Sequence, residues 1–338
     1  MYTKSRSSMF IAGTVGLLLG ASTVQVSASE EVTLRFAGQH PADHQGTRAI
    51  EAIAERIEEE TDGRITFRLH PAGQLGDYTL IYDEVMRGTV DMALISAPAE
   101  HDARIEAQWL PYIAQDHAEA AEVFGEGSFL YDRMREFHGE VGVRFLGFFG
   151  EGFIGLGSTE MPDNAFEPAA DKGQLVRVAP FRPAELLAES LGFRPNTLPY
   201  ADTYSAVQTG VVDGWIGGSA NLNYSAFRDV IDHFIAYNMF YEATSFFINE
   251  DRWESLSEED REIIGAAVRE YSEGSFEASR EEDAEYLERL SDAGVEVTTL
   301  SDEELQLLAE HVRGDVWPRL EERFGSDFIT EISEEFAR

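Results

Sequence analysis

Two histidines four residues apart, His40 and His44, have a spacing that suggests metal chemistry. On a helix this spacing places two imidazoles on one face, where they can bind an ion such as zinc. Pro41 lies between them, however, and predicts a loop rather than a helix face. We therefore expect no metal site and no cofactor.

The motifs of common hydrolases and nucleotide-binding enzymes are absent from the sequence. It contains no G-x-S-x-G, no G-x-x-x-x-G-K-[ST] and no H-E-x-x-H. It also has no cysteine, which excludes disulfides and cysteine-ligated metals. We therefore predict that the chain is not an enzyme.

The charge of the chain is strongly negative, with a formal net charge of -37. Such a charge disfavours nucleic acid and anionic lipid as partners. After Lys4 the only lysine is Lys172, whereas arginine, aspartate and glutamate are common. We interpret this acidity as an adaptation to high external salt, which screens self-repulsion, rather than as a property of the binding site.

The first residues have the order of a secretory signal peptide. Lys4 and Arg6 precede an apolar stretch from Met9 to Gly20, and small residues follow at Val26-Ser27-Ala28. We expect residues 1–28 to be removed and the mature protein to be periplasmic. A retained N-terminal anchor is the alternative, although the apolar stretch is short for a bilayer.

A strand-helix alternation follows and predicts a parallel α/β sheet. Short apolar alternations mark strands, whereas apolar residues at helical spacing mark the segments between them. In such a sheet, ligands bind beyond the carboxyl ends of the strands. The expected order is a strand at 32–36, a helix at 47–60, a strand at 65–69, a helix at 78–87 and a strand at 90–95.

The pattern begins again in the second half of the chain. Strands are expected at 144–149, 153–156, 175–178 and around 211–212, with a helix at 183–190. A long charged helix from Glu258 to Ser291, a strand at 295–299 and helical segments from Asp302 onward complete the chain. Two α/β halves predict two lobes, and a cleft between lobes is a favoured ligand site.

Five segments, in order along the chain, resemble the DctP-type solute receptors of TRAP transporters, the tripartite ATP-independent periplasmic transporters. They are Gly63-Arg64-Ile65, the Gly-rich turn Pro71–Gly76, Arg87–Ala93, Val176-Arg177-Val178 and Tyr204–Gly214. The resemblance covers essentially the whole mature chain.

The resemblance implies a two-lobed periplasmic-binding-protein-like fold. Each lobe would be a mainly parallel sheet flanked by helices, and a long helix would brace both lobes. The first lobe would comprise residues 29–152 and about 242–282, and the second about 153–241 and 283–338. The resemblance further implies that the protein hands its solute to a two-component membrane permease.

The resemblance also places Arg177 at the position of the family's carboxylate-binding arginine. A guanidinium is always charged and can hold a carboxylate through two parallel hydrogen bonds. Other positions that the resemblance places at the ligand are Gln39, Ser96, Phe153, Tyr200 and Trp215. An exposed or ion-paired arginine, and core packing of the aromatic residues, are the alternatives.

One position departs from the family pattern. Many relatives carry an asparagine shortly after the Asp-Gly pair, where this chain has Gly217. Asn221 or Asn223 could replace that side chain, or the glycine could make room for a larger ligand. The identity of the organic acid therefore stays open.

The predicted function is that of a periplasmic receptor that captures a small organic acid and delivers it to a permease, and we expect a monomer. Two alternatives remain open from the sequence. One is a sensory protein that presents its ligand to a membrane receptor. The other is a secreted enzyme on the same fold, which would need a paired acid and base in the cleft.

Overall fold

The computed structural model describes residues 31–336, and the predicted signal peptide lies outside these residues. The strands form one mixed sheet in the order β2-β1-β3-β8-β4-β7-β5-β6, and β9 pairs with β8. No helix among the described residues is long and apolar enough to cross a membrane. The strands are β1 (Val32–Gly38), β2 (Ile65–His70), β3 (Met92–Ile95), β4 (Val143–Ser158), β5 (Leu175–Val178), β6 (Arg194–Thr197), β7 (Gly214–Ile216), β8 (His233–Asn249) and β9 (Glu296–Thr299).

A first group of parallel strands, β1 to β3, follows the predicted alternation closely. Helix α1 (Gln45–Glu60) buries Ile50, Ile53 and Ile57 at helical spacing, and α2 (Tyr78–Met86) precedes β3. The side chain of His44 caps α1 by accepting a hydrogen bond from the backbone N–H of Gly46. The helix η1 (Ala103–Trp109), α3 (His117–Phe124) and α4 (Phe129–Glu140) complete this part of the chain.

A second group of parallel strands consists of β5, β6 and β7. Helices α5 (Arg182–Ser190) and α6 (Tyr200–Gln208) connect them, and the short helices α7 (Ala220–Leu222) and η2 (Asn223–Phe227) follow β7. The strand expected around Val211–Val212 is displaced, because those residues form a turn and β7 begins at Gly214. The ladder of β7 with β4 and β5 therefore starts at the glycine of the Asp-Gly pair.

The long antiparallel strands β4 and β8 join the two groups, because each has partners in both. The sequence predicts two separate strands where β4 is one, interrupted by register shifts at Gly147, Gly152 and Gly155. At Gly147 and Gly152 the backbone has φ of 154° and 106°, a conformation that residues other than glycine rarely adopt. The glycines therefore let one strand bend rather than end.

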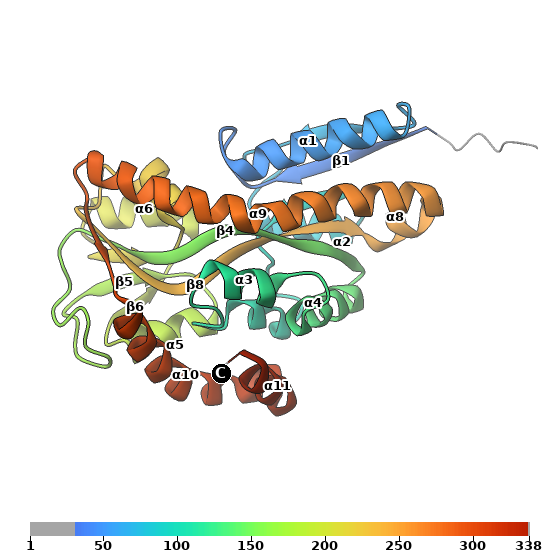
Figure 1. Cartoon of the computed structure of the whole chain (residues 1–338). Coiled ribbons are helices and arrows are strands. Elements are labelled where there is room, and N and C mark those ends of the chain that lie inside the picture. Colours follow the sequence, from blue (N-terminus) through green and yellow to red (C-terminus); the bar gives the residue numbers. More distant parts are fainter. Residues whose placement is uncertain (1–30, 337–338) are drawn as a thin grey trace, which may run out of the picture. The chain divides into compact units, whose positions relative to one another are not determined.

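Helix α9 (Glu258–Asp292) is confirmed as the long helix, and it lies along β4 (Figure 1). Its polar residues bond backbone groups beside the bulges of β4: Ser275 Oγ accepts from the N–H of Gly150 at 2.8 Å, and Asp283 accepts from that of Phe153 at 2.9 Å. Buried N–H groups that leave a ladder need such partners. Its contacts with α1 and α7 connect it to both strand groups.

The C-terminal helices α10 (Asp302–Phe324) and α11 (Ser326–Phe336) complete the fold, and α8 (Glu250–Ser255) precedes α9. Helix α10 begins with a capping box between Ser301 and Glu304 and contacts both α5 and η1. Trp317 donates to the carbonyl of Pro111 at 3.0 Å. These helices therefore attach to elements that precede and follow β4.

Candidate functional site

Arg177, on β5, is a buried cation without an ionic partner. It is 4% exposed, and its Nε donates to the carbonyl oxygen of Leu198 at 2.9 Å. Of the five N–H donors of a guanidinium, this contact uses one, and no carboxylate of the described chain forms an ion pair with Arg177. Burial lowers the pKa of Arg177 to about 10, so it remains charged at neutral pH.

The wall beside Arg177 is built from aromatic core residues. Trp215 is 1% exposed, stacks on Phe227 with ring centroids 4.1 Å apart, and donates to Asn223 at 3.0 Å. A Cβ atom at Gly217 would lie 2.6 Å from the Trp215 ring and 3.3 Å from Nη1 of Arg177. The family asparagine is therefore incompatible with Trp215 in this position, which explains the glycine.

The two asparagines that could replace it have different surroundings. Asn223 is fully buried and donates to the carbonyl oxygens of Gly217, Gly218 and Ser219, so it holds the turn after β7. Asn221 donates to Glu282 at 3.0 Å and accepts from Ser225. The polar atoms of Asn223 thus serve the fold, and those of Asn221 are engaged with α9.

The structure brings together two residues that the sequence places 57 positions apart. Gln39, after β1, donates to the Ser96 hydroxyl at 3.0 Å, and the backbone N–H of Ser96, after β3, donates to Gln39 at 2.7 Å. Both residues are half-buried at the carboxyl ends of neighbouring strands. The pair is therefore a rigid polar surface rather than two separate side chains.

Two aromatic candidates differ in exposure. Phe153 is buried, with its ring 5.0 Å from His117 and 5.1 Å from Tyr241, centroid to centroid. Tyr200, the first residue of α6, is 46% exposed, yet burial and the charge of Glu242 raise its pKa to about 12. The electrostatic influence of Arg177 reaches Tyr200, whereas Phe153 is a core contact of α3 and β8.

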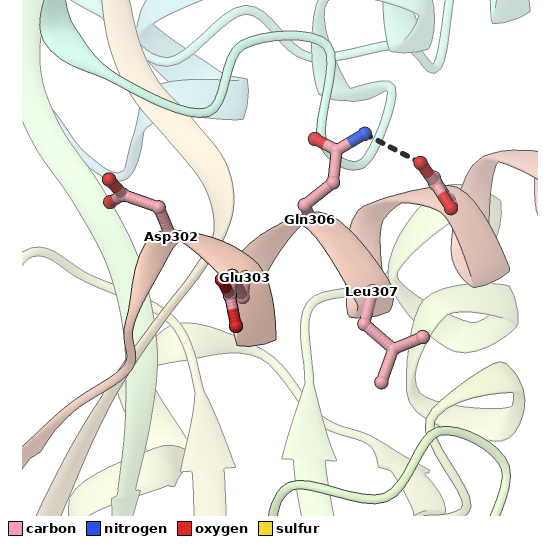
Figure 2. Close-up of a pocket in the computed structure, with 5 residues that line it drawn as sticks. Asp302, Glu303, Gln306 and Leu307 are labelled. Atoms are coloured by element: carbon pink, nitrogen blue, oxygen red, sulfur yellow. Dashed lines mark hydrogen bonds between the residues drawn. The ribbon is translucent and has the colours of Figure 1, made fainter.

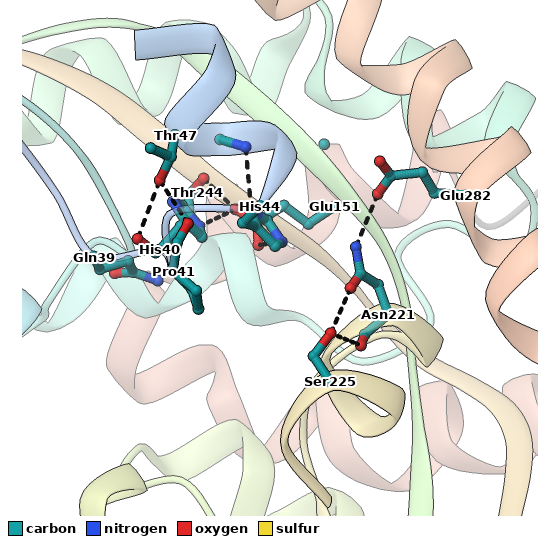
Figure 3. Close-up of polar contacts among 12 residues, drawn as sticks. Gln39, His40, Pro41, His44, Thr47, Glu151, Asn221, Ser225, Thr244 and Glu282 are labelled. Carbon is teal, nitrogen blue, oxygen red and sulfur yellow. Dashed lines mark hydrogen bonds and ion pairs between the residues drawn. The ribbon is translucent and has the colours of Figure 1, made fainter. Parts of the chain in front are cut away.

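Sequence reasoning missed a buried polar cluster of His40, His44, Glu151 and Thr244 (Figure 3). His40 Nε2 lies 2.8 Å from Glu151, and Thr244 donates to the same carboxylate. Burial alone would raise the pKa of Glu151, but the histidines and Thr244 outweigh it and hold this pKa below its usual range. Glu151 therefore carries its charge inside the protein.

This cluster has three potential metal ligands, since atoms of His40, His44 and Glu151 all lie within 4.8 Å of one another. The backbone N–H of Gly46, however, donates to Nδ1 of His44, which places the proton of a neutral ring on Nε2, the atom that faces Glu151. A metal-bound histidine instead donates from its second nitrogen. The hydrogen bond of His44 thus favours a proton, rather than a metal ion, on Nε2. Burial lowers the pKa of His44 to about 4, which favours the neutral ring.

Two more ionisable residues near Arg177 were missed. Tyr78, at the start of α2, and Glu242, on β8, each alter the pKa of Arg177 through their charge. Burial, followed by the charge of Glu151, raises the pKa of Glu242 to about 8. A signal existed for Glu242 and for Glu151: each is the only charged residue in an apolar segment, at 234–249 and 145–157 respectively.

Two surface hollows of the described chain have linings that do not include Arg177. One lies along the first turns of α10, where it is lined by Asp302, Glu303, Gln306, Leu307 and Glu310 (Figure 2). Gln306 donates to Glu310 at 2.8 Å, and the remaining polar groups face solvent. Another is lined by Arg135, Gly139, Arg144 and Glu250. Neither hollow contains a buried charged side chain without an ionic partner. The region of Arg177 does.

Comparisons with known proteins all point to solute-binding proteins. The family model described as bacterial extracellular solute-binding protein, family 7, matches residues 36–321. The C4-dicarboxylate-binding periplasmic protein DctP of Rhodobacter capsulatus is 24% identical and aligns over 94% of this chain and 96% of its own. The ectoine/5-hydroxyectoine-binding periplasmic protein UehA of Ruegeria pomeroyi is 28% identical, with 90% of each chain covered. The solved structure of a TRAP periplasmic solute-binding protein from Ochrobactrum anthropi has a TM-score of 0.81, 25% identity and coverage of 91% and 95%.

Proposed function

The chain belongs to family 7 of the bacterial extracellular solute-binding proteins, and from this premise we propose that it captures a small organic acid whose carboxylate binds Arg177. The family and the structural relatives are solute-binding receptors, not enzymes, with the two-lobed fold that the sequence predicts. The named ligands of the relatives differ, so similarity alone does not choose a solute.

The observation that carries the proposal is the unpaired charge of Arg177. A buried guanidinium without a carboxylate partner is costly, because its hydration is lost and not replaced. Its free donors form a planar fork that matches a carboxylate. A bound acid would supply the missing partner, so the ligand and the protein would each satisfy the other.

Ionisable residues that belong to both strand groups interact with Arg177. Tyr78 comes from α2 and Tyr200 from α6, and the charge of each is coupled to Arg177. The bonded pair of Gln39 and Ser96 lies at the ends of β1 and β3. We propose that an acid bound by Arg177 from one side meets these hydroxyl and amide groups from the other, so that binding favours the closed arrangement of the lobes.

The boundary between the lobes is part of the proposal. We place it where β4 and β8 pass from one strand group to the other, at the pairs Gly152 with Glu242 and Phe153 with Tyr241. The first lobe is then 29–152 with about 242–282, and the second about 153–241 with 283–338. The bulge at Gly152 gives the strand pair a bend at this boundary.

The wider role follows from the family. We propose secretion to the periplasm through the signal peptide at 1–28, transfer of the acid to the membrane permease subunits of a TRAP transporter, and a monomeric receptor. The family consists of extracellular solute-binding proteins, and the related DctP of Rhodobacter capsulatus is periplasmic, which supports this compartment. The oligomeric state is testable by light scattering at several protein concentrations.

A thermal-shift screen tests the proposed ligand class. Purified mature protein is heated with small monocarboxylates, dicarboxylates, sugar acids and amino acids, and with neutral sugars and amides as controls. A ligand that binds only the native state raises the Tm in a concentration-dependent way. We expect carboxylates alone to do so. A best ligand without an anionic group would contradict the role of Arg177.

A further inference from the structure

A second ionisable group without an ionic partner lies near Arg177, and it is an acid. Glu242 is on β8, opposite Gly152 of β4, at the point where the two strands join the strand groups. Its carboxylate accepts a hydrogen bond from the backbone N–H of Ser219, which precedes α7. Among the described residues, no arginine, lysine or histidine forms an ion pair with it.

The other carboxylates of this region already have partners. Glu151 bonds His40 and Thr244, and Asp283 bonds the N–H of Phe153 and pairs with His117 at 3.3 Å. Glu282 likewise accepts from Asn221 at 3.0 Å and pairs with Arg48 at 3.4 Å (Figure 3). Glu242 is therefore the carboxylate of this group whose capacity for a cation is unused.

Glu242 and Arg177 influence each other without pairing. The charge of Arg177 lowers the pKa of Glu242, and that of Glu242 raises the pKa of Arg177. Their charged atoms nevertheless form no ion pair. Both groups lie at the turn after β7: Nη1 of Arg177 would be 3.3 Å from a Cβ atom at Gly217, and the N–H of Ser219, two residues later, bonds Glu242. A cation and an acid therefore lie near each other, each without an ionic partner among the described residues.

We propose that the ligand is zwitterionic: its carboxylate binds Arg177, and a positively charged nitrogen of the same molecule binds Glu242. This inference rests on the proposed function, because it needs Arg177 as the carboxylate site. A molecule with one charge of each sign would give both the buried Arg177 and the half-buried Glu242 an ionic partner. A purely anionic acid would instead bring a further negative charge toward Glu242, Glu151 and Asp283.

The charges that face Glu242 come from four elements. Glu151 on β4 and Asp283 on α9 disfavour its ionised form, whereas Arg177 on β5 favours it. Tyr200 on α6 lies close enough for Glu242 to raise its pKa. With a pKa near 8, Glu242 is largely protonated at pH 7 in the free protein, and a cationic nitrogen would ionise it. Zwitterion binding at pH 7 should therefore release a proton.

Matched pairs of acids test the proposal. Each pair shares a carboxylate and a shape but differs in the positive charge: 4-aminobutanoate and pentanoate, proline and cyclopentanecarboxylate, glycine betaine and 3,3-dimethylbutanoate. Succinate represents dianions. All seven are added to the thermal-shift screen, and those that bind are titrated by calorimetry. We expect the zwitterion of a binding pair to bind at least tenfold more tightly than its isostere.

Variants assign the preference to Glu242. In Glu242→Gln the preference should disappear, through a loss of tenfold or more for the zwitterion and little change for the isostere. The exposed Glu189, which pairs with Arg319 at the surface, provides the control Glu189→Gln, which should bind as the wild type does. Titration of the zwitterion at pH 7 in two buffers of different ionisation enthalpy should report proton release in the wild type and none in Glu242→Gln.

The outcomes separate this inference from the proposed function. If succinate or other acids without a cationic nitrogen are the best ligands of the whole screen, the proposal of a zwitterionic ligand is wrong. The proposed carboxylate site at Arg177 would still stand. A zwitterion preference that survives Glu242→Gln also overturns the assignment. If no carboxylate of either kind binds, both the inference and the proposed function fail.

Discussion

Two regions of this protein bury charged side chains, and they do so in opposite ways. In the first, Asp91 is 1% exposed and accepts hydrogen bonds from the backbone N–H and the Nε of Arg35, at 2.8 and 2.9 Å, and from Nε of Arg252 at 2.9 Å. Burial would raise the pKa of Asp91, but these donors hold it below its usual range. Asp91 thus connects β1, the start of β3 and α8 and is fully partnered.

In the second region, Arg177 is buried and Glu242 is half-buried, and neither forms an ion pair with another described residue. A buried charge with partners contributes to folding, because removing one partner leaves the others unsatisfied. A buried charge without partners costs stability and is retained for another reason. The comparison therefore separates residues that stabilise the fold from residues that we propose bind the ligand.

The largest effect on stability is expected for Asp91→Ala. It leaves two arginines facing a buried space, and we expect the free energy of unfolding to fall by about 3 kcal/mol, the lower part of the range for buried pairs, because both arginines are about one-third exposed. Urea denaturation measures the change. Asp315→Ala, in an exposed pair with Arg319, is the control and should change stability by less than about 0.5 kcal/mol. Equal losses of stability in Asp91→Ala and Asp315→Ala would contradict the stabilising role of the buried Asp91.

Next in size is the effect of filling the space beside Arg177. Gly217→Ala places a methyl group 2.6 Å from the Trp215 ring, so overpacking should cost about 1–3 kcal/mol. Gly274→Ala, at an open position in α9, should be neutral or slightly stabilising. Thermal denaturation of both variants gives the difference. A harmless Gly217→Ala would show that Trp215 does not exclude the family asparagine.

The two regions should respond to pH with opposite signs. The folded pKa of Asp91 is lowered, so its stabilisation is present above its unfolded pKa and is lost as the pH falls through the folded value. The folded pKa of Glu242 is raised from 4.5 to about 8, so the folded state binds more protons between these values and stability falls as the pH rises through them.

Denaturation curves from pH 4.5 to 8.5 test the second sign. Glu242→Gln should remove part of the decline in stability over this range and should be at least as stable as the wild type at pH 8. A decline of the same slope in both proteins would mean that Glu242 is not the group that titrates.

The smallest expected effect is that of a chelator. Because Nδ1 of His44 accepts from Gly46, the cluster of His40, His44 and Glu151 favours protons over metal. EDTA should leave the Tm and the affinity for the acid unchanged. A lower Tm after EDTA, restored by zinc, would assign a metal ion to this cluster. The cluster would then belong with Asp91 among the charged groups that have partners.

The sequence predicts what depends on local pattern. The period of α1, the length of α9 and the strands β1 to β3 follow from apolar spacing, and the family resemblance points to Arg177. Strand β8 was not predicted, because it is an almost continuous apolar run interrupted by Asn238, whose φ is 50°. The continuity of β4 was missed because α9, 125 residues later, supplies the hydrogen bond at its bulge.

The site was harder to predict than the fold for a physical reason. Whether a charge is paired depends on contacts between distant segments, such as Asn223 with Trp215 or Glu151 with His40. Asn223 and Trp215 have the residue types of a binding site, yet they satisfy each other. Glu242 is the only charged residue of an apolar segment, yet the sequence does not show that it is half-buried without an ionic partner.

Calorimetric titration of Arg177 variants tests the central claim most directly. The ligand is the carboxylate that raises the Tm most in the screen, and circular dichroism confirms folding. Arg177→Ala should lose about 3 kcal/mol of binding, on the order of a hundredfold in Kd, and should be no less stable than the wild type, because no protein carboxylate loses a partner. Arg177→Lys should also bind weakly, since an ammonium lacks the planar fork. Arg182→Ala, in an exposed pair with Glu185, is the control and should bind normally. Near-normal affinity in a folded Arg177→Ala protein would contradict the account.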